Sequence, residues 1–334
     1  MRSLREFRAG KPAFYPDQSI YAAFACVEFG LAFSDLDGGT GLVVSVASPT
    51  RTVYFGAGRC SWYPQNNASA ATLASDKYFT NVILERAGVP TLGGDYFFLH
   101  ARLRAHRPPG HESEDARRHF SELGGSAFVK PLTGSRGDFA QALRGEAALD
   151  RYLTEVSQVY DAILMQPVVS GTEYRIFLLD DEVLFCARKS PPFLLGDGLR
   201  SLRALLIAHN EVLRGRGLSP VSMTGDDSAL DAILPAGARW DIPGRTNWSV
   251  GGAMVLDGPC SDGALAMARS AVHALGLRVA AVDLFTDIEA DAEAIRVIEV
   301  NANPSIRLLE QQDRGDLILK IWHHTFLSQG LLAR

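Results

Sequence analysis

Short apolar runs rich in β-branched and aromatic residues alternate along the chain with longer segments of helical pattern. The short runs predict strands at 42–47, 52–55, 96–99, 127–132, 163–169, 174–179 and 183–187. The longer segments predict helices at 19–33, 68–88, 147–160 and 201–213, and one more from a cap at Ser113 to Gly124-Gly125. This mixture predicts an α+β fold with more than one sheet.

Two later apolar runs carry isolated polar residues. Asp283 interrupts the run 280–285, and Glu299 and Asn301 stand two residues apart in the run that follows. Positions i and i+2 of a strand point to the same side, so Glu299 and Asn301 can offer oxygen ligands to one hard cation. If the runs pair as a hairpin through the polar loop 286–293, Asp283 completes a magnesium site. Taken singly, Asp283 could be a core carboxylate and Glu299 could form an internal ion pair.

The common nucleotide signatures, Gly-x-x-x-x-Gly-Lys-Ser/Thr and Gly-x-Gly-x-x-Gly, are absent, so phosphates would have to be held by other groups. Lys130 precedes a small loop whose glycines let backbone N–H groups approach phosphate oxygens. The loop residues are Gly134, Ser135, Arg136 and Gly137. An ordinary hairpin turn explains this loop equally well. Lys77 lies near the middle of the helix 68–88, where a lone lysine is usually a solvated surface residue.

Composition narrows the function classes. The chain has 334 residues, of which 47% are hydrophobic, enough for two or three compact units. A net charge of −5 argues against nucleic acid as the main partner. The sequence predicts neither an export signal nor a membrane span. The cysteines are far apart, at Cys26, Cys60, Cys186 and Cys260, and predict neither a zinc site nor a disulfide framework, which favours a reducing cytoplasm.

Taken in order, the motifs resemble those of the ATP-grasp superfamily of carboxylate-amine ligases, over residues 56–315. The ordered set carries the resemblance more than any single motif. It comprises Asp76-Lys77, Ala87-Gly88-Val89-Pro90, Val129-Lys130-Pro131, Gly134-Ser135-Arg136-Gly137, Gly171-Thr172-Glu173-Tyr174-Arg175, Gly196-Asp197-Gly198, Arg245-x-Asn247-x-x-x-Gly251-Gly252, Asp283 and Glu299-x-Asn301-x-Asn303-Pro304. Within the superfamily the chain is most similar to the ATP-grasp parts of cyanophycin synthetase and of the bifunctional γ-glutamylcysteine/glutathione synthetase.

The resemblance implies an ATP-grasp fold in which two α+β subdomains clasp ATP. It implies an N-terminal substrate domain over 1–75, a lid subdomain over 76–168 and a large subdomain with the metal site over 169–334. The residues implied to bind ATP are Lys77, Lys130, Gly134, Ser135, Arg136, Gly137, Gln166, Val168, Glu173 and Arg175. The implied metal ligands are Asp283, Glu299 and Asn301, which would hold one or two Mg²⁺ ions, or Mn²⁺. Arg245 would face the transferring phosphate, and Arg175 and Asn247 would lie near the acyl acceptor.

The chain departs from the family pattern at three points. Relatives often carry arginine where Lys189 falls, so either Arg188 or Lys189 can serve at that position. The usual glycine after the final proline is Ser305, at the end of the site that takes the substrate carboxylate. The additional catalytic portions of the two bifunctional relatives have no counterpart, so neither full reaction is transferred.

The resemblance implies an ATP-dependent ligase of the EC 6.3 type that joins the carboxylate of an amino acid or short peptide to an amine through an acyl phosphate, with a γ-glutamyl product as one candidate. The implied partners are ATP and small amino-acid or peptide substrates, with no nucleic acid and no membrane, in a homo-oligomer and by preference a dimer. Two alternatives remain open. One is an ATP-binding regulatory or scaffold protein without catalysis, and the other is an ATP-grasp kinase.

Overall fold

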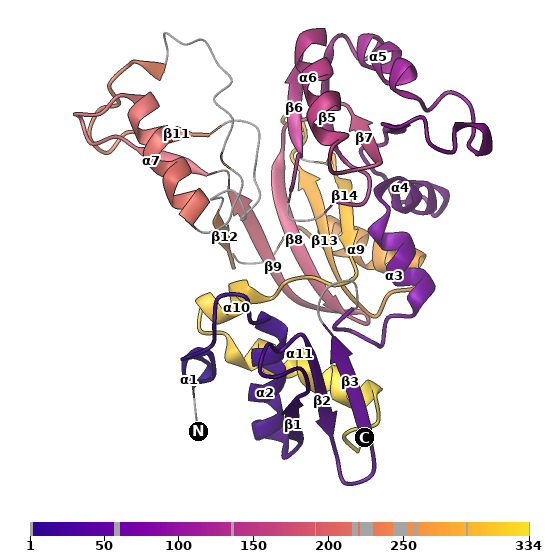
Figure 1. Cartoon of the computed structure of the whole chain (residues 1–334), viewed down its shortest axis with the longest axis vertical. Helices are drawn as coiled ribbons and strands as arrows, with labels where there is room; N and C mark the ends of the chain where they lie inside the picture. Colours follow the sequence, from indigo (N-terminus) through magenta and orange to yellow (C-terminus); the bar gives the residue numbers. More distant parts are fainter. Residues whose placement is uncertain are drawn as a thin grey trace.

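The computed structural model describes residues 3–56, 61–134, 137–190, 192–215, 220, 230–242, 253–256, 260–291 and 293–333. In this part of the chain the strands form four sheets, of three, four, five and two strands. Figure 1 shows an N-terminal unit that carries both chain ends, a central sheet above it, and two further units on either side of the upper end of that sheet. No helix in the described ranges has the length and apolar character needed to cross a bilayer.

The N-terminal unit combines the two ends of the chain. Its strands β1 (Ala32–Asp35), β2 (Val43–Ala47) and β3 (Thr52–Gly56) form an antiparallel sheet, and its helices are α1 (Leu4–Arg8), α2 (Asp17–Phe29), α10 (Arg307–Gln311) and α11 (Gly315–Ser328). Tyr21 of α2 and Trp322 and Phe326 of α11 are fully buried in one core. The burial of these large aromatic side chains holds α2 against α11, which lies about 300 residues later in the chain.

The predictions for this unit are partly confirmed. The hairpin predicted over 42–55 is confirmed by β2 and β3. The helix predicted over 19–33 is wrong at its end, because α2 stops at Gly30, which adopts the left-handed conformation with φ 65°. Phe33 therefore lies in β1.

The lid unit is a four-stranded antiparallel sheet covered by two helices. Its strands are β4 (Asp95–Phe98), β5 (Ser126–Pro131), β6 (Gln141–Arg144) and β7 (Ala162–Gln166), in the order β4-β7-β5-β6. The two covering helices are α5 (Ser113–Glu122) and α6 (Glu146–Val156), and a short 3₁₀ helix, η1 (Arg104–His106), precedes them. Phe120 and Tyr152 pack from α5 and α6 into the core of this unit. The cap of α5 is Glu112 and not Ser113 as predicted, because Asp115 and Glu112 complete a reciprocal capping box.

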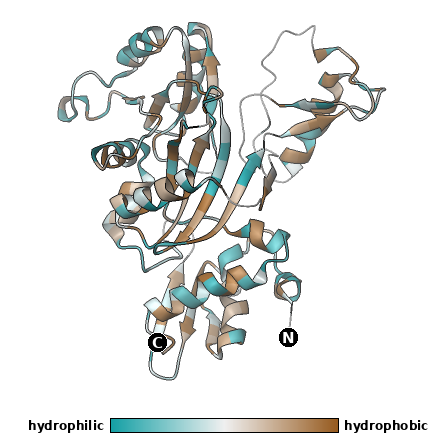
Figure 2. Cartoon of the chain, turned by 180° about the vertical axis from the view of Figure 1, so that it is seen from behind, coloured by the Kyte–Doolittle hydropathy of each residue, from teal (hydrophilic) through white to brown (hydrophobic). Residues whose placement is uncertain are grey.

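The central sheet places the charged strands side by side. Its strands are β8 (Thr172–Leu179), β9 (Glu182–Ser190), β12 (Ala253–Val255), β13 (Val279–Thr286) and β14 (Arg296–Asn301), in the order β12-β9-β8-β13-β14. One face packs on the helices α3 (Ala68–Ser75), α4 (Lys77–Arg86) and α9 (Asp262–Leu275). The other face packs in part on the N-terminal unit, through Phe177 and Ala281. Figure 2 shows how hydrophobic residues concentrate on these strands.

The helix predicted over 68–88 is two helices. Asp76 adopts an extended conformation, and its carboxylate accepts hydrogen bonds from the N–H groups of Tyr78 and Phe79, as an N-cap does. Lys77 is therefore the first residue of α4 and not a mid-helix residue. This position brings its backbone and side chain to the loop that follows β5.

A smaller unit stands on the far side of the central sheet from the lid. It contains α7 (Leu202–Gly215) and the strand pair β10 (Phe193–Leu195) and β11 (Arg239–Asp241). Leu205 and Leu206 of α7 pack with Leu194 of β10 in a separate core.

One expectation about cysteines is wrong. Cys186 of β9 and Cys260, just before α9, form a disulfide with a Cα–Cα distance of 6.5 Å. Cys26 is buried and free, and Cys60 lies outside the described residues. The spacing of 74 residues between the bonded cysteines carries no sequence signal, because only the pairing of β9 and the entry of α9 brings them together.

Candidate active site

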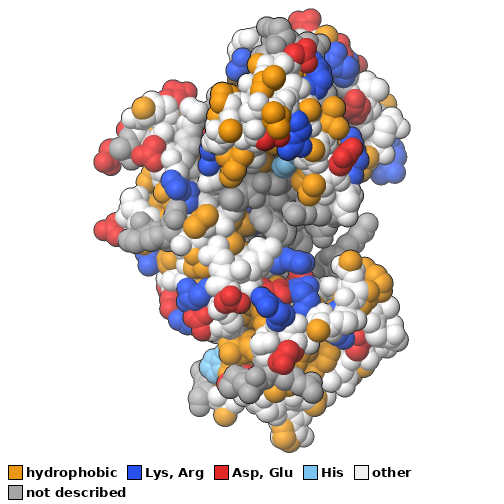
Figure 3. Space-filling model, turned by 90° about the vertical axis from the view of Figure 1, so that its left-hand side faces the viewer, with side chains coloured by type: hydrophobic (Ala, Val, Ile, Leu, Met, Phe, Trp, Pro, Cys, Tyr) orange, Lys and Arg blue, Asp and Glu red, His pale blue; other side chains and the backbone are white. Residues whose placement is uncertain are grey.

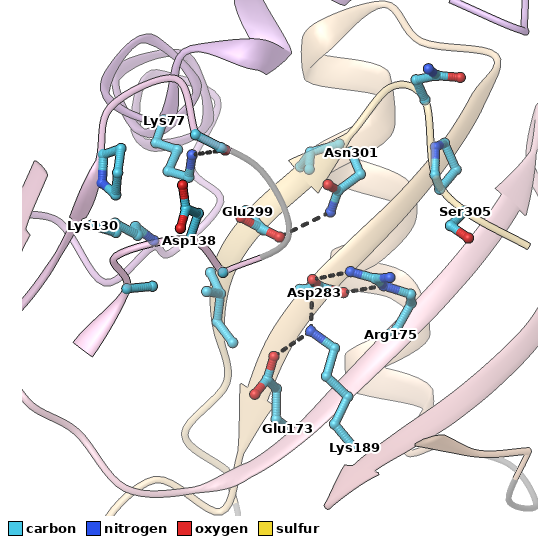
Figure 4. Close-up of a pocket in the computed structure, with 18 of the residues that line it drawn as sticks. Lys77, Lys130, Asp138, Glu173, Arg175, Lys189, Asp283, Glu299, Asn301 and Ser305 are labelled. Carbon is cyan, nitrogen blue, oxygen red and sulfur yellow. Dashed lines mark hydrogen bonds and ion pairs between the residues drawn. The ribbon is translucent and has the colours of Figure 1, made fainter. Parts of the chain in front are cut away.

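A cleft of about 2990 Å³ lies between the lid, the central sheet and the N-terminal unit. Residues from all three line it, including Lys77, Lys130, Asp283, Glu299 and Arg307. Figure 4 shows the charged side chains that meet at its centre. Since no single unit supplies this lining, the fold and not a local motif creates the site.

The alternation of strand side chains explains why these charges share one face of the central sheet. Along β13, Ala280, Val282 and Leu284 point to the helix-covered face, so Asp283 points to the opposite face. Asp283 is paired in register with Arg175 on β8 and with Glu299 on β14. Directly paired residues of antiparallel strands have Cβ atoms about 4.5–5.5 Å apart. The predicted hairpin of the two late runs, with Asp283 beside Glu299, is therefore confirmed as a strand pairing.

Asp283 lies at the centre of a buried ion network. Arg175 donates to both of its oxygens, from Nε at 2.8 Å and from Nη2 at 2.7 Å, and Lys189 Nζ donates to Oδ2 at 2.8 Å. Lys189 also donates to Glu173 at 2.5 Å. Asp283 is fully buried and Lys189 is 6% exposed. The network balances two cations with two carboxylates, which is the condition under which charges are stable away from water.

The pKa values in this network follow from that balance. Burial by itself would raise the pKa of Asp283, but the charges of Arg175 and Lys189 outweigh it and hold the pKa well below its usual range. Burial would likewise lower the pKa of Lys189, and the carboxylates of Asp283 and Glu173 outweigh it, so that this pKa is raised. Both groups are charged at neutral pH.

Glu299 and Asn301 extend the site toward the lid. They are half-buried, and Asn301 Nδ2 donates to Glu299 Oε1 at 3.2 Å. This contact shows that both side chains lie on the same side of β14, as the two-residue spacing predicts. A register shift next to Asp283 marks a β-bulge in this hairpin, an irregularity that commonly re-aims side chains at functional sites.

Two lysines face Glu299 from the lid side of the cleft. Lys77 Nζ donates to the carbonyl oxygen of Gly134 at 2.7 Å, so it lies directly on the glycine-flanked loop. Burial lowers the pKa of Lys77 and lowers that of Lys130 to about 8, and the attraction of Glu299 offsets this only in part. In contrast to Lys189, these two ammonium groups have too little negative charge around them. An anionic ligand would supply the missing negative charge.

The lid loop approaches its own strand closely at Gly134. A Cβ atom there would come within 2.9 Å of Pro131 Cβ, so only glycine fits without a shift. Gly134 and Gly137 line the cleft together with Lys77 and Lys130. Ser135 and Arg136, predicted to cover the phosphates, lie outside the described residues.

The end of β7 presents an unsatisfied hydrogen-bond acceptor. Gln166, the last residue of β7, donates from Nε2 to the carbonyl of Gly93 at 2.6 Å, whereas its buried Oε1 accepts no hydrogen bond from the described residues. Val168, 42% exposed, also lines the cleft in the segment 167–171 that joins the lid sheet to the central sheet. A ligand that carries an exocyclic amino group would satisfy Gln166 Oε1.

Three other candidates from the sequence are Arg188, Arg245 and Asn247. Arg188 is exposed and its neighbour Lys189 is buried, because adjacent strand residues point to opposite faces. Of the two basic residues left open by the sequence, Lys189 is the one in the cleft. Arg245 and Asn247, predicted near the transferring phosphate and the acceptor, lie outside the described residues.

Sequence reasoning missed several charged residues that line the cleft. Asp138 directly follows the glycine-flanked loop, and Tyr160 donates to its carboxylate at 2.8 Å. Arg307 follows Pro304 by three residues, and Asp17 begins α2. The position of Arg307 after the run of metal-ligand candidates is the one sequence signal that could have found it.

The structure is similar to solved ATP-grasp proteins. It matches a bifunctional glutathione synthetase from Pasteurella multocida with a TM-score of 0.54 and 17% identity, over 93% of this chain and 44% of that one. It matches a D-alanine–D-alanine ligase from Bacillus anthracis with a TM-score of 0.50 and 13% identity, over 79% of this chain and 70% of that one. The predicted fold is therefore confirmed, and the chain has the ATP-grasp fold.

Sequence comparison finds the same relatives that the motifs indicated. The glutathione biosynthesis bifunctional protein of Streptococcus thermophilus is 28% identical over 258 residues, which is 70% of this chain and 32% of the relative. The cyanophycin synthetase of Crocosphaera subtropica is 25% identical over 272 residues, which is 74% of this chain and 29% of the relative. The chain thus spans about a third of the length of these relatives. No protein-family model matches it.

The lowered pKa of Lys130 predicts a pH-dependent stability. Since its pKa is about 8 in the folded protein and about 10.4 when unfolded, the unfolded chain holds more protons between about pH 8 and pH 10. The free energy of unfolding should therefore gain about 3 kcal/mol from this group as the pH rises through that window. Urea unfolding of the nucleotide-free protein measures it. Lys130→Met should be more stable than wild type near neutral pH, by a margin that shrinks at high pH.

The exposed Lys320, bonded to Glu182 on the surface, provides the control for removing a positive charge. Lys320→Met should change the free energy of unfolding by about 1 kcal/mol or less. A margin for Lys130→Met that stays constant or grows with pH would contradict the lowered pKa.

Proposed function

We propose that this protein is an ATP-dependent ligase that joins the carboxylate of an amino acid or short peptide to an amine through an acyl phosphate, with ADP and phosphate as the other products. The observation that carries the proposal is the division of charge in the cleft. Lys77 and Lys130 lack sufficient counter-charge, and they face Glu299 and Asn301 across the site. A triphosphate with a bound divalent cation complements both sides of this arrangement.

The residues present fit a magnesium ion. Glu299, Asn301 and Asp283 offer hard oxygen donors from neighbouring strands, and Asn301 needs only to turn its amide oxygen toward the ion. In the described ranges no group of three or more His, Cys, Asp or Glu side chains forms a metal-binding cluster. Magnesium bound by few carboxylates leaves positions for phosphate oxygens. When bound, the ion would neutralise charge that develops on the transferred phosphate.

The chain's own residues supply positioning and electrostatics. Lys77 and Lys130 would hold the phosphates from the lid side, and Gln166 Oε1 would accept the adenine amino group. Arg175 and Lys189 lie beside Asp283, where they would stabilise negative charge on the acyl phosphate. The substrate carboxylate attacks the γ-phosphorus, ADP leaves, and the amine then displaces phosphate from the acyl carbon.

The two alternatives make different demands on the site. A scaffold protein needs only to bind ATP, and Arg175 and Lys189 would then serve only to balance the buried charge of Asp283. A kinase would transfer the phosphate to a hydroxyl and release a stable ester. The sequence relatives are named for amide-forming reactions, which favours the ligase.

Incubation with ATP, magnesium and pairs of amino acids tests the proposal. We expect phosphate release that requires both a carboxylate donor and an amine, together with a new amide product in the mass spectrum. A phosphorylated product that persists would favour the kinase. Tight ATP binding without turnover for any pair would favour the scaffold.

Other expectations accompany this proposal. We propose the domain division 1–75, 76–168 and 169–334, which the separate N-terminal, lid and central sheets support in outline. Packing of α3 and α4 on the central sheet extends the large unit into the end of the first range and the start of the second. One or two magnesium ions, replacement by Mn²⁺, a dimer and a cytoplasmic location remain predictions. The Cys186–Cys260 disulfide is unusual for a reducing compartment.

A further inference from the structure

The N-terminal unit forms a charged wall of the cleft. Arg8, Lys11, Asp17 and Arg307 all line it, on the side away from the lid. Figure 3 shows basic and acidic side chains gathered together on the face where this unit meets the hollow below the upper units. The phosphate-binding residues lie on the lid side, so this wall is available to the other substrates.

One ion pair of the wall is structural. Arg8 donates to both oxygens of Glu310, from Nε and Nη2 at 2.5 Å each, and Tyr21 donates to the same carboxylate at 2.7 Å. The side chain of Glu310 is 14% exposed. A bidentate pair with a third donor is saturated and holds α1 and α2 against α10.

The second ion pair is weak and open. Arg307 Nη1 donates to Asp17 Oδ1 at 3.1 Å and to Oδ2 at 3.3 Å, and the two side chains are 39% and 26% exposed. Asp17 Oδ1 also accepts a hydrogen bond from Arg8 Nη2 at 2.7 Å, so Oδ2 is the oxygen that is bound only by the longer contact with Arg307 among the described residues. Exposed pairs of this kind contribute about 0–1 kcal/mol. A ligand could therefore separate the two charges at little cost, provided that it offers each of them an opposite charge.

Arg307 is connected to the metal candidates by a fixed segment. The residues between Asn301 and Arg307 all line the cleft. Trp62 N–H donates to Asn303 Oδ1 at 3.1 Å, and Tyr63 Oη donates to the carbonyl of Pro304 at 3.3 Å. Six residues reach at most about 20 Å when extended. Arg307 therefore lies no farther from Asn301 than the length of a short extended peptide of about six residues.

We propose that Asp17 and Arg307 bind the main-chain charges of one substrate, an α-amino acid or short peptide in its zwitterionic form. Arg307 takes the α-carboxylate, for which its guanidinium is suited, and Asp17 takes the α-ammonium group. Arg307 exchanges Asp17 for the substrate carboxylate, and Asp17 keeps its hydrogen bond from Arg8 and takes the ammonium group in place of Arg307, so no net charge is buried. The inference rests on the proposed function and deepens it, because it names the charge pattern of one substrate and the residues that select it.

Binding measurements that do not need turnover test this proposal. The probes are the twenty common L-amino acids, each in the free form, as the N-acetyl derivative and as the carboxamide, examined by saturation-transfer NMR and titration. We expect at least one free amino acid to bind and its two blocked forms to bind at least about tenfold more weakly, as the loss of one charged contact predicts.

Substitutions then assign the two charges separately. Asp17→Asn should weaken binding of the free amino acid about tenfold and remove the discrimination against the N-acetyl form only. Arg307→Gln should also weaken binding of the free amino acid about tenfold, but it should remove the discrimination against the carboxamide only. Arg307→Lys should restore part of the affinity. The matched control is Arg314→Gln, because Arg314 forms an exposed pair with Asp316 a few residues away and does not line the cleft. It should bind like wild type.

Three results would overturn the proposal. These are no amino acid of the panel binding to wild-type protein, both variants binding like wild type, or both losing affinity for all three forms alike, as a structural defect would cause. ADP release is measured on the same samples. Charge-selective binding without any ADP release would instead count against the ligase and leave the zwitterion site standing.

Discussion

Replacing Glu299 with Gln should reduce ADP formation by at least about a thousandfold and leave the protein folded. The substitution keeps the shape of the side chain and removes the negative charge that faces Lys77 and Lys130 and that would hold the metal ion. Because Glu299 is half-buried on a strand near the cleft surface, the fold should tolerate the amide. The measurement is the steady-state rate of ADP release, with circular dichroism and unfolding midpoints as the check on folding.

Glu293 provides a matched control, since it is exposed in the loop of the same hairpin. Glu293→Gln should release ADP at the wild-type rate. Magnesium titration adds a readout besides activity, and Glu299→Gln should bind the ion more weakly in the presence of ATP. Normal ADP release by Glu299→Gln would refute the assigned metal role.

Replacing Asp283 with Asn should destabilise the fold by about 3–5 kcal/mol, in addition to stopping catalysis. The amide leaves Arg175 without its counter-charge and Lys189 with Glu173 alone, in a position where Asp283 itself is fully buried. The cost of an uncompensated buried charge is larger than the contribution of the pair. Equilibrium urea unfolding measures it.

The exposed pair of Arg314 and Asp316 provides the comparison. Asp316→Asn should cost about 1 kcal/mol or less. Combining Asp283→Asn with Arg175→Met should recover part of the stability, because the second change removes the cation that the first one leaves unpaired. An Asp283→Asn protein as stable as wild type would show that the network is not charge-balanced as described.

The strand pairing at the centre of the site could be predicted from the sequence. Asp283, Glu299 and Asn301 stand in two apolar runs joined by a short polar loop, and the period of two fixes which side chains share a face. The nearest pairing is a hairpin, so no long-range information was needed. The same reasoning correctly predicted the hairpin of β2 and β3.

The cations around Asp283 could not be placed in the same way. Arg175 and Lys189 reach it only because β8 lies beside β13 and β9 lies on the other side of β8, and strand order is not encoded in periodicity. The break at Asp76 was missed for a related reason, since a helical pattern continues on both sides and the cap is visible only in its hydrogen bonds. The wall with Asp17 and Arg307 joins opposite ends of the chain, beyond any local signal.

The central claim is that a substrate carboxylate attacks ATP in this cleft and becomes an acyl phosphate. An oxygen-18 label in that carboxylate tests it most directly, because the amine later displaces phosphate from the acyl carbon and carries no oxygen away. Using an amino-acid pair that supports turnover, the account predicts that one labelled oxygen per turnover appears in inorganic phosphate. Phosphate that contains no oxygen from the substrate would contradict the account.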